Sequence, residues 1–228
     1  MINHYGSDLP NHEQLKDYEP PIVTRLYAGD GRLMAEFAQE KRVFMPIEAI
    51  PDLVKNAFIS AEDKNFYTHP GVDFWAVARA AVSNAKNAGS GRRLVGASTI
   101  TQQVAKNFLL TNERSYERKL KEAILAYRME KAMSKDHLLE LYLNEIFLGY
   151  RAYGVAAASL VYFDKPLDQL SISEAAYLAA LPKAPNNYHP IRKKEAAIGR
   201  RNWVIDQMLK NEHVSEGQAD LALSLIHI

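Results

Sequence analysis

The chain has 228 residues, of which 47% are hydrophobic and 24% are charged, a balance typical of a globular protein with a packed core. Its formal net charge of +1 argues against a dedicated polyanion-binding protein, and the lack of cysteine excludes disulfides and thiolate metal sites. No apolar run approaches the ~20 residues that a bilayer-spanning helix needs, and no signal peptide is visible. We therefore expect a soluble piece.

The N-terminal part has a β-type pattern. Residues 1–20 are polar and lack periodicity, so we expect a poorly ordered lead-in. Residues 22–27 and 32–37 form short β-type runs, and the Asp30-Gly31 dipeptide between them predicts a hairpin. A third short run, 42–45, is a candidate strand. The rest of the chain has helical patterns.

Two adjacent carboxylates follow the first of these helices. Apolar residues at helical spacing predict a helix over 52–61, which leaves Glu62 and Asp63 at its C-terminal end. That end of the helix dipole disfavours negative charge, and a turn at Pro70-Gly71 closes the segment. Carboxylates in that place suggest a functional pair, although this stretch alone favours a solvated surface pair.

A second helix and a basic loop come next. Residues 74–86 place their apolar side chains on one side, and the flexible loop 87–96 carries Arg92-Arg93. An apolar helix beside a basic loop could lie on an anionic membrane surface. A core helix followed by a solvated loop explains the pattern equally well, so both readings stay open.

The next helix starts with a group of polar side chains. Thr99 and Gln102 match a capping box, which predicts that the helix begins here. Gln102 shares a face with Lys106, and Gln103 shares one with Asn107. A glycine-flanked helix start with a nearby lysine predicts a phosphate site, with a well-capped surface helix as the alternative.

The helix predicted over 115–132 has an apolar stripe and a charged face. Arg118, Lys119 and Glu122 share that charged face at spacings of three and four. Taken alone, such residues are usually a solvated ion pair that stabilises a helix by a few tenths of a kcal/mol.

Further helices are predicted over 135–147, from 171 or 173 to 181, and over 194–210. Glu140 and Asn144 share a face of the first of these helices.

Taken together and in this order, five segments resemble the peptidoglycan glycosyltransferase domain of the class A penicillin-binding proteins, glycosyltransferase family 51. The matching motifs, first to fifth, are Glu62-Asp63-x-x-Phe66-x-x-His69-x-Gly71, Gly96-x-Ser98-Thr99-Ile100-Thr101-Gln102-Gln103 with Lys106-Asn107, Arg118-Lys119-x-x-Glu122, Lys135-x-x-Leu138-Leu139-Glu140-x-Tyr142-Leu143-Asn144, and Arg200-Arg201-x-x-Val204. Five spaced motifs in order are very specific. The resemblance covers residues 20–220.

The resemblance implies a mainly α, lysozyme-like fold with two lobes and a small N-terminal β-hairpin element. We expect a flexible lead-in plus β-hairpin linker over 1–45, the glycosyltransferase domain over 46–222, and a non-native tail over 223–228. The family's N-terminal membrane anchor and its transpeptidase domain have no counterpart in the sequence, which fits a fragment. Family enzymes act at the periplasmic face of the bacterial inner (cytoplasmic) membrane.

The implied reaction polymerises lipid II into β-1,4-linked glycan strands for the cell wall, with inversion at the anomeric carbon. Lipid pyrophosphate leaves, so the site needs positive charge for the leaving group and a general base for the acceptor hydroxyl. The implied partners are lipid II, the growing glycan strand and a membrane surface that one lobe faces; nucleic acid is not among them.

Within this reaction Glu62 is the candidate base, positioned by Asp63 and His69, and Glu122 is the second catalytic carboxylate. Glu122 would orient the pyrophosphate-binding cations or ligate Mg²⁺ or Mn²⁺, and the sequence leaves that choice open. No organic cofactor is expected. The candidates for substrate binding are Asp63, Phe66, His69, Ser98, Thr99, Gln102, Gln103, Lys106, Asn107, Arg118, Lys119, Glu140 and Asn144.

Two other classes compete with this interpretation. A lysozyme-like muramidase or lytic transglycosylase also uses a glutamate, but it cuts glycan and needs an acid for the leaving sugar oxygen. The cations of the third motif have no obvious purpose in that reaction. The second competitor is a non-catalytic membrane-surface scaffold.

Overall fold

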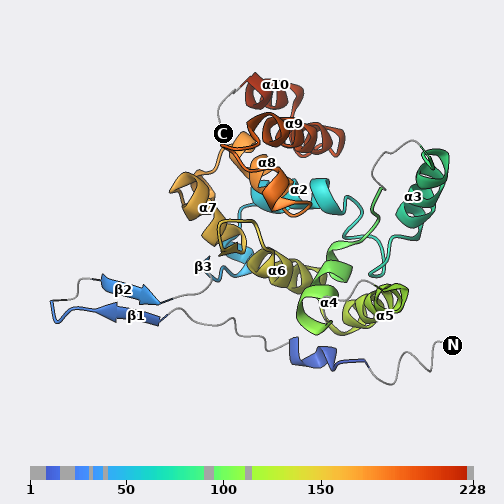
Figure 1. Ribbon diagram of the computed structural model, residues 1–228, viewed down its shortest axis with the longest axis horizontal. Coiled ribbons are helices and arrows are strands. Elements are labelled where there is room, and N and C mark those ends of the chain that lie inside the picture. The colour runs from blue at the N-terminus through green and yellow to red at the C-terminus, as the bar shows by residue number, and fades with distance from the viewer. Residues whose placement is uncertain are drawn as a thin grey trace. The chain divides into compact units, whose positions relative to one another are not determined.

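The computed structural model describes residues 9–15, 24–30, 33–37, 41–89, 95–110 and 115–224. Helices make up most of this part, and the strands are short (Figure 1). The predicted mainly α fold class is therefore confirmed. The chain divides into two compact units: the first unit comprises Met1–Tyr18 and Glu62–Leu139, and the second unit comprises Glu19–Ala61 and Glu140–Ile228.

The first unit consists of helices joined by loops. Its elements are the short 3-10 helix η1 (His12–Leu15), α3 (Phe74–Lys86), α4 (Ile100–Leu109), α5 (Tyr116–Ala132) and the start of α6 (Lys135–Glu145). Helices α4 and α5 pack against each other, and η1 packs on α5. Buried side chains such as Val104, Leu125 and Met129 form the core between them.

Side-chain caps determine where these helices begin. The predicted capping box is present at α4, where Thr99 accepts the Gln102 N–H and the Gln102 side chain accepts the Thr99 N–H. Asp73 and Ser115 accept N–H groups at the starts of α3 and α5. These caps satisfy donors that a helix leaves without an internal partner. Helices α3 and α4 therefore start where the sequence predicted.

The second unit is organised around α8, a helix whose side chains are almost all buried. Its helical elements are η2 (Ile47–Ala49), α2 (Asp52–Glu62, except for its last residue), the end of α6, α7 (Val155–Phe163), η3 (Leu167–Gln169), α8 (Ile172–Ala180), η4 (Pro185–Asn187), α9 (Lys194–Lys210) and α10 (Glu216–Ser224). Helix α8 packs mainly against α9, and a capping box from Ser171 to Glu174 begins it.

The strands of the second unit form two small sheets. Strands β1 (Thr24–Tyr27) and β2 (Leu33–Phe37) pair antiparallel, so the predicted hairpin is confirmed, although Gly31 of its turn lies outside the described residues. The candidate strand 42–45 is instead β3 (Lys41–Arg42), which pairs in parallel with β4 (Ala152–Tyr153). Its parallel partner is far along the chain, so no local pattern predicts this pairing.

Both ends of the described chain contain helical structure. Leu15 in the lead-in is buried, and its carbonyl oxygen accepts a hydrogen bond from His137 Nε2 at 3.0 Å. One apolar side chain and one carbonyl thus attach the segment 9–15 to the rest of the first unit. The polar composition of this segment did not predict that contact. Helix α10 extends into the predicted tail as far as Ser224, and residues 225–228 lie outside the described part. No helix of the described ranges is both long and apolar enough to cross a bilayer.

Candidate active site

Glu62, the candidate base, is the last residue of α2 and begins the segment Glu62–Leu139 of the first unit. The side-chain amide of Gln103 on α4 donates to Glu62 Oε2 at 2.9 Å. This bond joins the first motif to the second and fixes one oxygen of the carboxylate. A hydrogen bond donated to a carboxylate favours its ionised form, which is the form that a base requires.

Asp63 and His69 form a buried pair beside Glu62. His69 Nε2 lies 3.0 and 2.8 Å from the two Asp63 carboxylate oxygens. His69 Nδ1 accepts the Gly71 N–H, so we assign the ring proton to Nε2, which donates it to Asp63. Asp63 Oδ2 also accepts the Ile100 N–H at the start of α4, at 2.9 Å. These bonds fit the positioning role that the sequence predicts for Asp63 and His69.

The loop after His69 rests on α5 and on the start of α4. Gly71 has a φ of +93°, and a Cβ there would come within 2.7 Å of the Ala126 carbonyl oxygen. The Gly71 carbonyl accepts the Thr99 hydroxyl at 2.6 Å. Thr99 and Gln102 are buried. Their side chains form the capping hydrogen bonds, and the Thr99 hydroxyl also donates to the Gly71 carbonyl. The predicted capping box is thus confirmed, and the contact of these two residues with substrate stays a prediction.

The third motif forms an ion cluster around a buried carboxylate. Glu122 is 2% exposed, and its two oxygens lie 2.8 Å from Arg118 Nη1 and 2.6 Å from Lys119 Nζ. Lys119 also donates to Ser98 Oγ at 2.7 Å, which links this cluster to the second motif. A carboxylate with so little exposure does not fit the solvated pair that the helix alone suggested, because an isolated buried charge would cost several kcal/mol.

Lys106 connects the two carboxylates electrostatically. Its burial lowers the pKa of the ammonium below its ordinary value, and the positive charges of Arg118 and Lys119 lower it further. The carboxylates of Glu122 and Glu62 act in the opposite direction. Three cations and two carboxylates of the first unit therefore share one region. Asn107, the next residue of α4, is exposed.

Phe66, predicted to bind substrate, is fully buried. Its ring packs edge-on against Tyr67 and His69, and Lys135 Nζ lies 4.6 Å from its centre. Phe66 therefore supports the first-motif loop from within the core.

Glu140 and Asn144 belong to the second unit, where they hold the segment 45–47. Asn144 Oδ1 accepts the Met45 N–H at 2.8 Å, and its amide donates to the Met45 carbonyl at 2.9 Å. Glu140 Oε2 accepts the Ile47 N–H at 2.8 Å. Both side chains bind backbone, a role that sequence reasoning missed.

The fifth motif also lies in the second unit. Arg201 on α9 is buried, and this burial lowers the pKa of its guanidinium. It donates two hydrogen bonds to the side-chain oxygen of Asn202. The guanidinium of Arg200 stacks 3.8 Å from the centre of the Trp203 ring. Both arginines of this motif thus have neighbours on their own helix.

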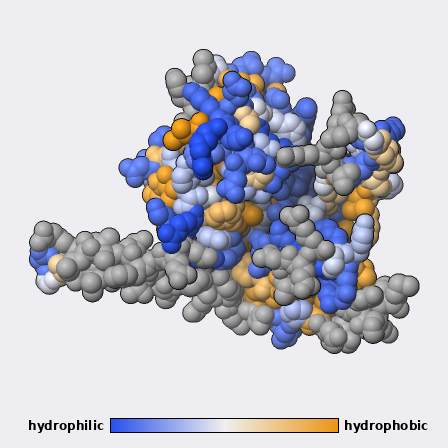
Figure 2. Space-filling model, viewed as in Figure 1, coloured by the Kyte–Doolittle hydropathy of each residue, from blue (hydrophilic) through white to orange (hydrophobic). Residues whose placement is uncertain are grey.

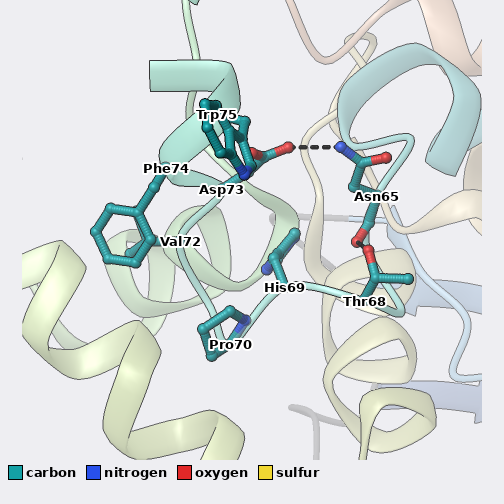
Figure 3. Close-up of a pocket in the computed structure, with 8 residues that line it drawn as sticks. All are labelled: Asn65, Thr68, His69, Pro70, Val72, Asp73, Phe74 and Trp75. Carbon is teal, nitrogen blue, oxygen red and sulfur yellow. Dashed lines mark hydrogen bonds between the residues drawn. The ribbon is translucent and has the colours of Figure 1, made fainter. Parts of the chain in front are cut away.

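A cavity of about 260 Å³ lies along the first-motif loop and the start of α3 (Figure 3). Asn65 donates to Asp73 Oδ2 at 2.8 Å, and Asp73 Oδ1 accepts the Ala76 N–H. Burial alone would raise the pKa of Asp73, but these hydrogen bonds and the nearby Arg79 and His69 hold it below its ordinary value. Sequence reasoning missed Asn65 and Asp73, although an Asp directly before a predicted helix is a cap signal.

The described residues do not fit a metal site at Glu122. No group of three His, Cys, Asp or Glu side chains in this part of the chain could hold a metal ion. Both Glu122 oxygens face cationic side chains, which would repel a divalent ion. We therefore derive no step through a metal.

Comparison with known proteins gives consistent matches. The family model described as Transglycosylase matches residues 30–209. Penicillin-binding protein 1A of Rickettsia conorii is 52% identical over 98% of this chain and 28% of that protein. Penicillin-binding protein 1A of Neisseria gonorrhoeae is 46% identical over 95% of this chain and 27% of that protein. The crystal structure of penicillin-binding protein 1A from Haemophilus influenzae gives a TM-score of 0.52 at 26% identity, covering 92% of this chain and 21% of that one.

The motifs, the site geometry and these matches define a glycosyltransferase domain. The chain belongs to the transglycosylase family, which confirms the predicted family and the predicted enzyme class, a peptidoglycan glycosyltransferase. It spans less than a third of the length of the penicillin-binding proteins that it resembles.

Proposed function

We propose that the chain polymerises lipid II into β-1,4-linked glycan strands at the periplasmic face of the bacterial inner membrane. The observation that carries this proposal is the presence, in one unit, of two carboxylates that have different bonding partners. Glu62 is held by an uncharged amide, whereas Glu122 is held by two cations. One carboxylate suits proton transfer, and the other suits the organisation of positive charge.

In the proposed reaction, a sugar hydroxyl of the acceptor attacks the anomeric carbon of the donor. Glu62 accepts the hydroxyl proton as the new C–O bond forms. The bond from the anomeric carbon to the pyrophosphate oxygen breaks, and its electron pair leaves with the lipid pyrophosphate. Attack from the face opposite the leaving group inverts the anomeric configuration.

Lys106, Arg118 and Lys119 supply the positive charge that the leaving pyrophosphate needs. Their charges are in place before the reaction, so little reorganisation is required as negative charge develops. The Glu122 carboxylate binds Arg118 at 2.8 Å and Lys119 at 2.6 Å. Of the two roles that the sequence left open for Glu122, these ion pairs favour the orientation of the cations.

The geometry favours synthesis over glycan cleavage. A muramidase or lytic transglycosylase needs a protonated carboxylic acid for the leaving sugar oxygen. Glu62 accepts a hydrogen bond from Gln103, which favours a charged carboxylate, and Lys106 lies close enough to affect it electrostatically. The cation cluster around Glu122 suits a phosphate leaving group, which glycan cleavage lacks.

Helix α3 is the proposed membrane contact of this domain. Ala80 is its one buried residue, whereas Phe74 and Trp75 are 70% and 78% exposed. Apolar side chains gather over α3 on the right-hand side of Figure 2. The exposure of these rings supports the membrane-surface reading of this helix; Arg92-Arg93 lie outside the described residues. We also propose that the natural protein carries a transpeptidase domain, as the name penicillin-binding protein suggests for its relatives.

Incubation of the chain with lipid II tests the proposal, with a divalent cation present in one arm and chelated in another. We expect glycan polymer and released lipid pyrophosphate, and loss of both in Glu62→Gln. Finished glycan serves as the alternative substrate. Release of short fragments from glycan, without polymer from lipid II, would establish cleavage instead. A wild-type protein inert towards both substrates would favour the scaffold reading.

A further inference from the structure

Glu130, near the end of α5, joins two helices of the first unit. Its Oε1 atom accepts the Thr101 hydroxyl at 2.6 Å and the Lys135 ammonium at 2.7 Å. Thr101 belongs to the first turn of α4, and Lys135 is the first residue of α6. The proposed reaction uses neither Glu130 nor Lys135.

Lys135 extends this network to the first-motif loop. Its ammonium donates to the His69 carbonyl at 2.8 Å and lies 4.6 Å from the centre of the Phe66 ring. The ammonium therefore binds the loop through a carbonyl, an aromatic face and the Glu130 carboxylate together.

The network is shielded from solvent. The Glu130 side chain is 8% exposed, the Lys135 side chain is 20% exposed, and Thr101 is fully buried. Hydrogen bonds to charged groups are stronger than neutral ones, and weak screening preserves that strength. Loss of one partner leaves the others buried without their charge or donor, which is costly.

The bonds form a closed circuit around the start of α4. From Glu130 the circuit runs through Lys135 to the His69 carbonyl, and from the His69 ring to Asp63. Asp63 accepts the Ile100 N–H, and the hydroxyl of the adjacent Thr101 donates to Glu130, which closes the circuit. Gln103, which binds Glu62, is two residues further along the same helix.

We infer that Glu130 and Lys135 are positioning residues that fix the first turn of α4 against the first-motif loop. Through Gln103 they set the orientation of Glu62, which rests on the proposed role of Glu62 as the base. A slight rotation of α4 would move the Gln103 amide away from Glu62 Oε2. The hydrogen bonds of the circuit involve none of Lys106, Arg118 and Lys119 among the described residues, so substrate affinity should change little.

Conservative substitutions within the circuit test this inference. Thr101→Val removes the hydroxyl at nearly constant volume, Thr101→Ser retains it, and Glu130→Gln removes the charge. We expect kcat to fall about tenfold in Thr101→Val and Glu130→Gln, with KM within twofold of wild type and with Thr101→Ser close to wild type. The double variant should resemble the single variants, because both remove the same link.

The Lys165–Glu174 pair of the second unit is the matched control. Glu174 accepts Lys165 at 2.7 Å and also the Ser171 N–H, so it resembles Glu130 in having two donors. Glu174→Gln should lower stability to a similar degree and leave kcat within twofold. Equal losses of kcat in Glu174→Gln and Glu130→Gln would overturn the inference, as would folded Thr101→Val and Glu130→Gln variants with wild-type kcat.

Hydrogen exchange of the α4 amides separates this inference from the proposed reaction. Thr101→Val and Glu130→Gln should exchange the amides of 100–103 faster, while Glu174→Gln should not. If the wild type fails to polymerise lipid II, the reaction is wrong, and the exchange result still decides whether the circuit fixes α4. Unchanged exchange in both variants would overturn the positioning role.

Discussion

The Gln103 amide donates to Glu62 Oε2 at 2.9 Å, across 41 positions of sequence. This bond makes the orientation of the candidate base depend on the start of a different helix. Neither residue alone distinguishes a catalytic site from a capped surface helix. Their contact shows that the first two motifs meet in one place.

Gln103→Met should lower kcat because it removes the donor and keeps the length of the side chain. A hydrogen bond to a charged group contributes about 1.5–3 kcal/mol, so we expect a loss of about tenfold or more. Steady-state kinetics on lipid II measure it. Gln169→Met, at an exposed position in η3, is the control and should retain wild-type kcat. A wild-type rate in Gln103→Met would show that the bond does not orient the base.

Lys106 should impose an alkaline limit on activity. Its pKa lies below the ordinary 10.5, so the ammonium loses its charge at lower pH than a solvated lysine does. In the proposed reaction the charged form binds pyrophosphate, so kcat/KM, which reports the free enzyme, should fall as pH rises towards 10.5.

Two variants assign that limit to Lys106. Glu122→Gln removes a charge that raises the Lys106 pKa, so the fall should begin at lower pH. Lys106→Arg carries a guanidinium that stays charged, so its residual activity should lack the fall. An unchanged profile in Lys106→Arg would assign the limit to another group.

Local signals account for most of what the sequence predicted about the fold. The caps at Thr99 and Ser171 depend on residues three positions apart, so the helix starts at both places were predictable. The parallel pairing of β3 with β4 and the docking of Leu15 depend on distant partners. No periodicity encodes those contacts.

The candidate site shows the same division between local and distant information. The shared face of Glu140 and Asn144 follows from helix geometry, but their bonds to Met45 and Ile47 do not. Glu130 had no signal at all, because a glutamate near a helix end is ordinarily solvated. Its proposed positioning role depends on its hydrogen bonds to Thr101 of α4 and Lys135 of α6, which no local pattern predicts.

The buried carboxylate of Glu122 should show strong coupling with Arg118. Glu122→Gln leaves two cations without their counter-charge, and we expect a loss of on the order of 1–3 kcal/mol in the free energy of unfolding. Adding Arg118→Met removes one unpaired cation, so the double variant should be less destabilised than the sum of the single variants. Chemical denaturation of all four proteins measures this coupling. Additive losses would mean that the pair contributes nothing beyond its separate side chains.

Gly71→Ala should destabilise the first unit and lower activity together. A non-glycine residue at φ +93° is strained by about 1–2 kcal/mol, and the new Cβ would meet the Ala126 carbonyl oxygen at 2.7 Å. Displacement of this turn also breaks the bond from Thr99 to the Gly71 carbonyl. Gly199→Ala is the control, since beyond the neighbouring backbone of α9 no described atom lies within 4 Å of the added Cβ. The Gly199→Ala substitution should stabilise the protein by up to about 1 kcal/mol. Equal effects of the two substitutions on stability would contradict the close approach at Gly71.

Phe74→Ser and Trp75→Ser should weaken membrane binding without unfolding the domain, because both rings are exposed in α3. Burial of one such ring in a lipid interface contributes roughly 1.5–3 kcal/mol, so each change should lower vesicle partitioning at least about tenfold. Flotation with anionic vesicles measures it, and binding should also fall with salt, because Arg79 and Lys86 are exposed on the same helix. Ile191→Ser, at a position that is 81% exposed in the second unit, is the matched control. If all three variants float like wild type, α3 is not the membrane contact, whereas equal losses in all three would indicate non-specific adhesion of exposed apolar groups.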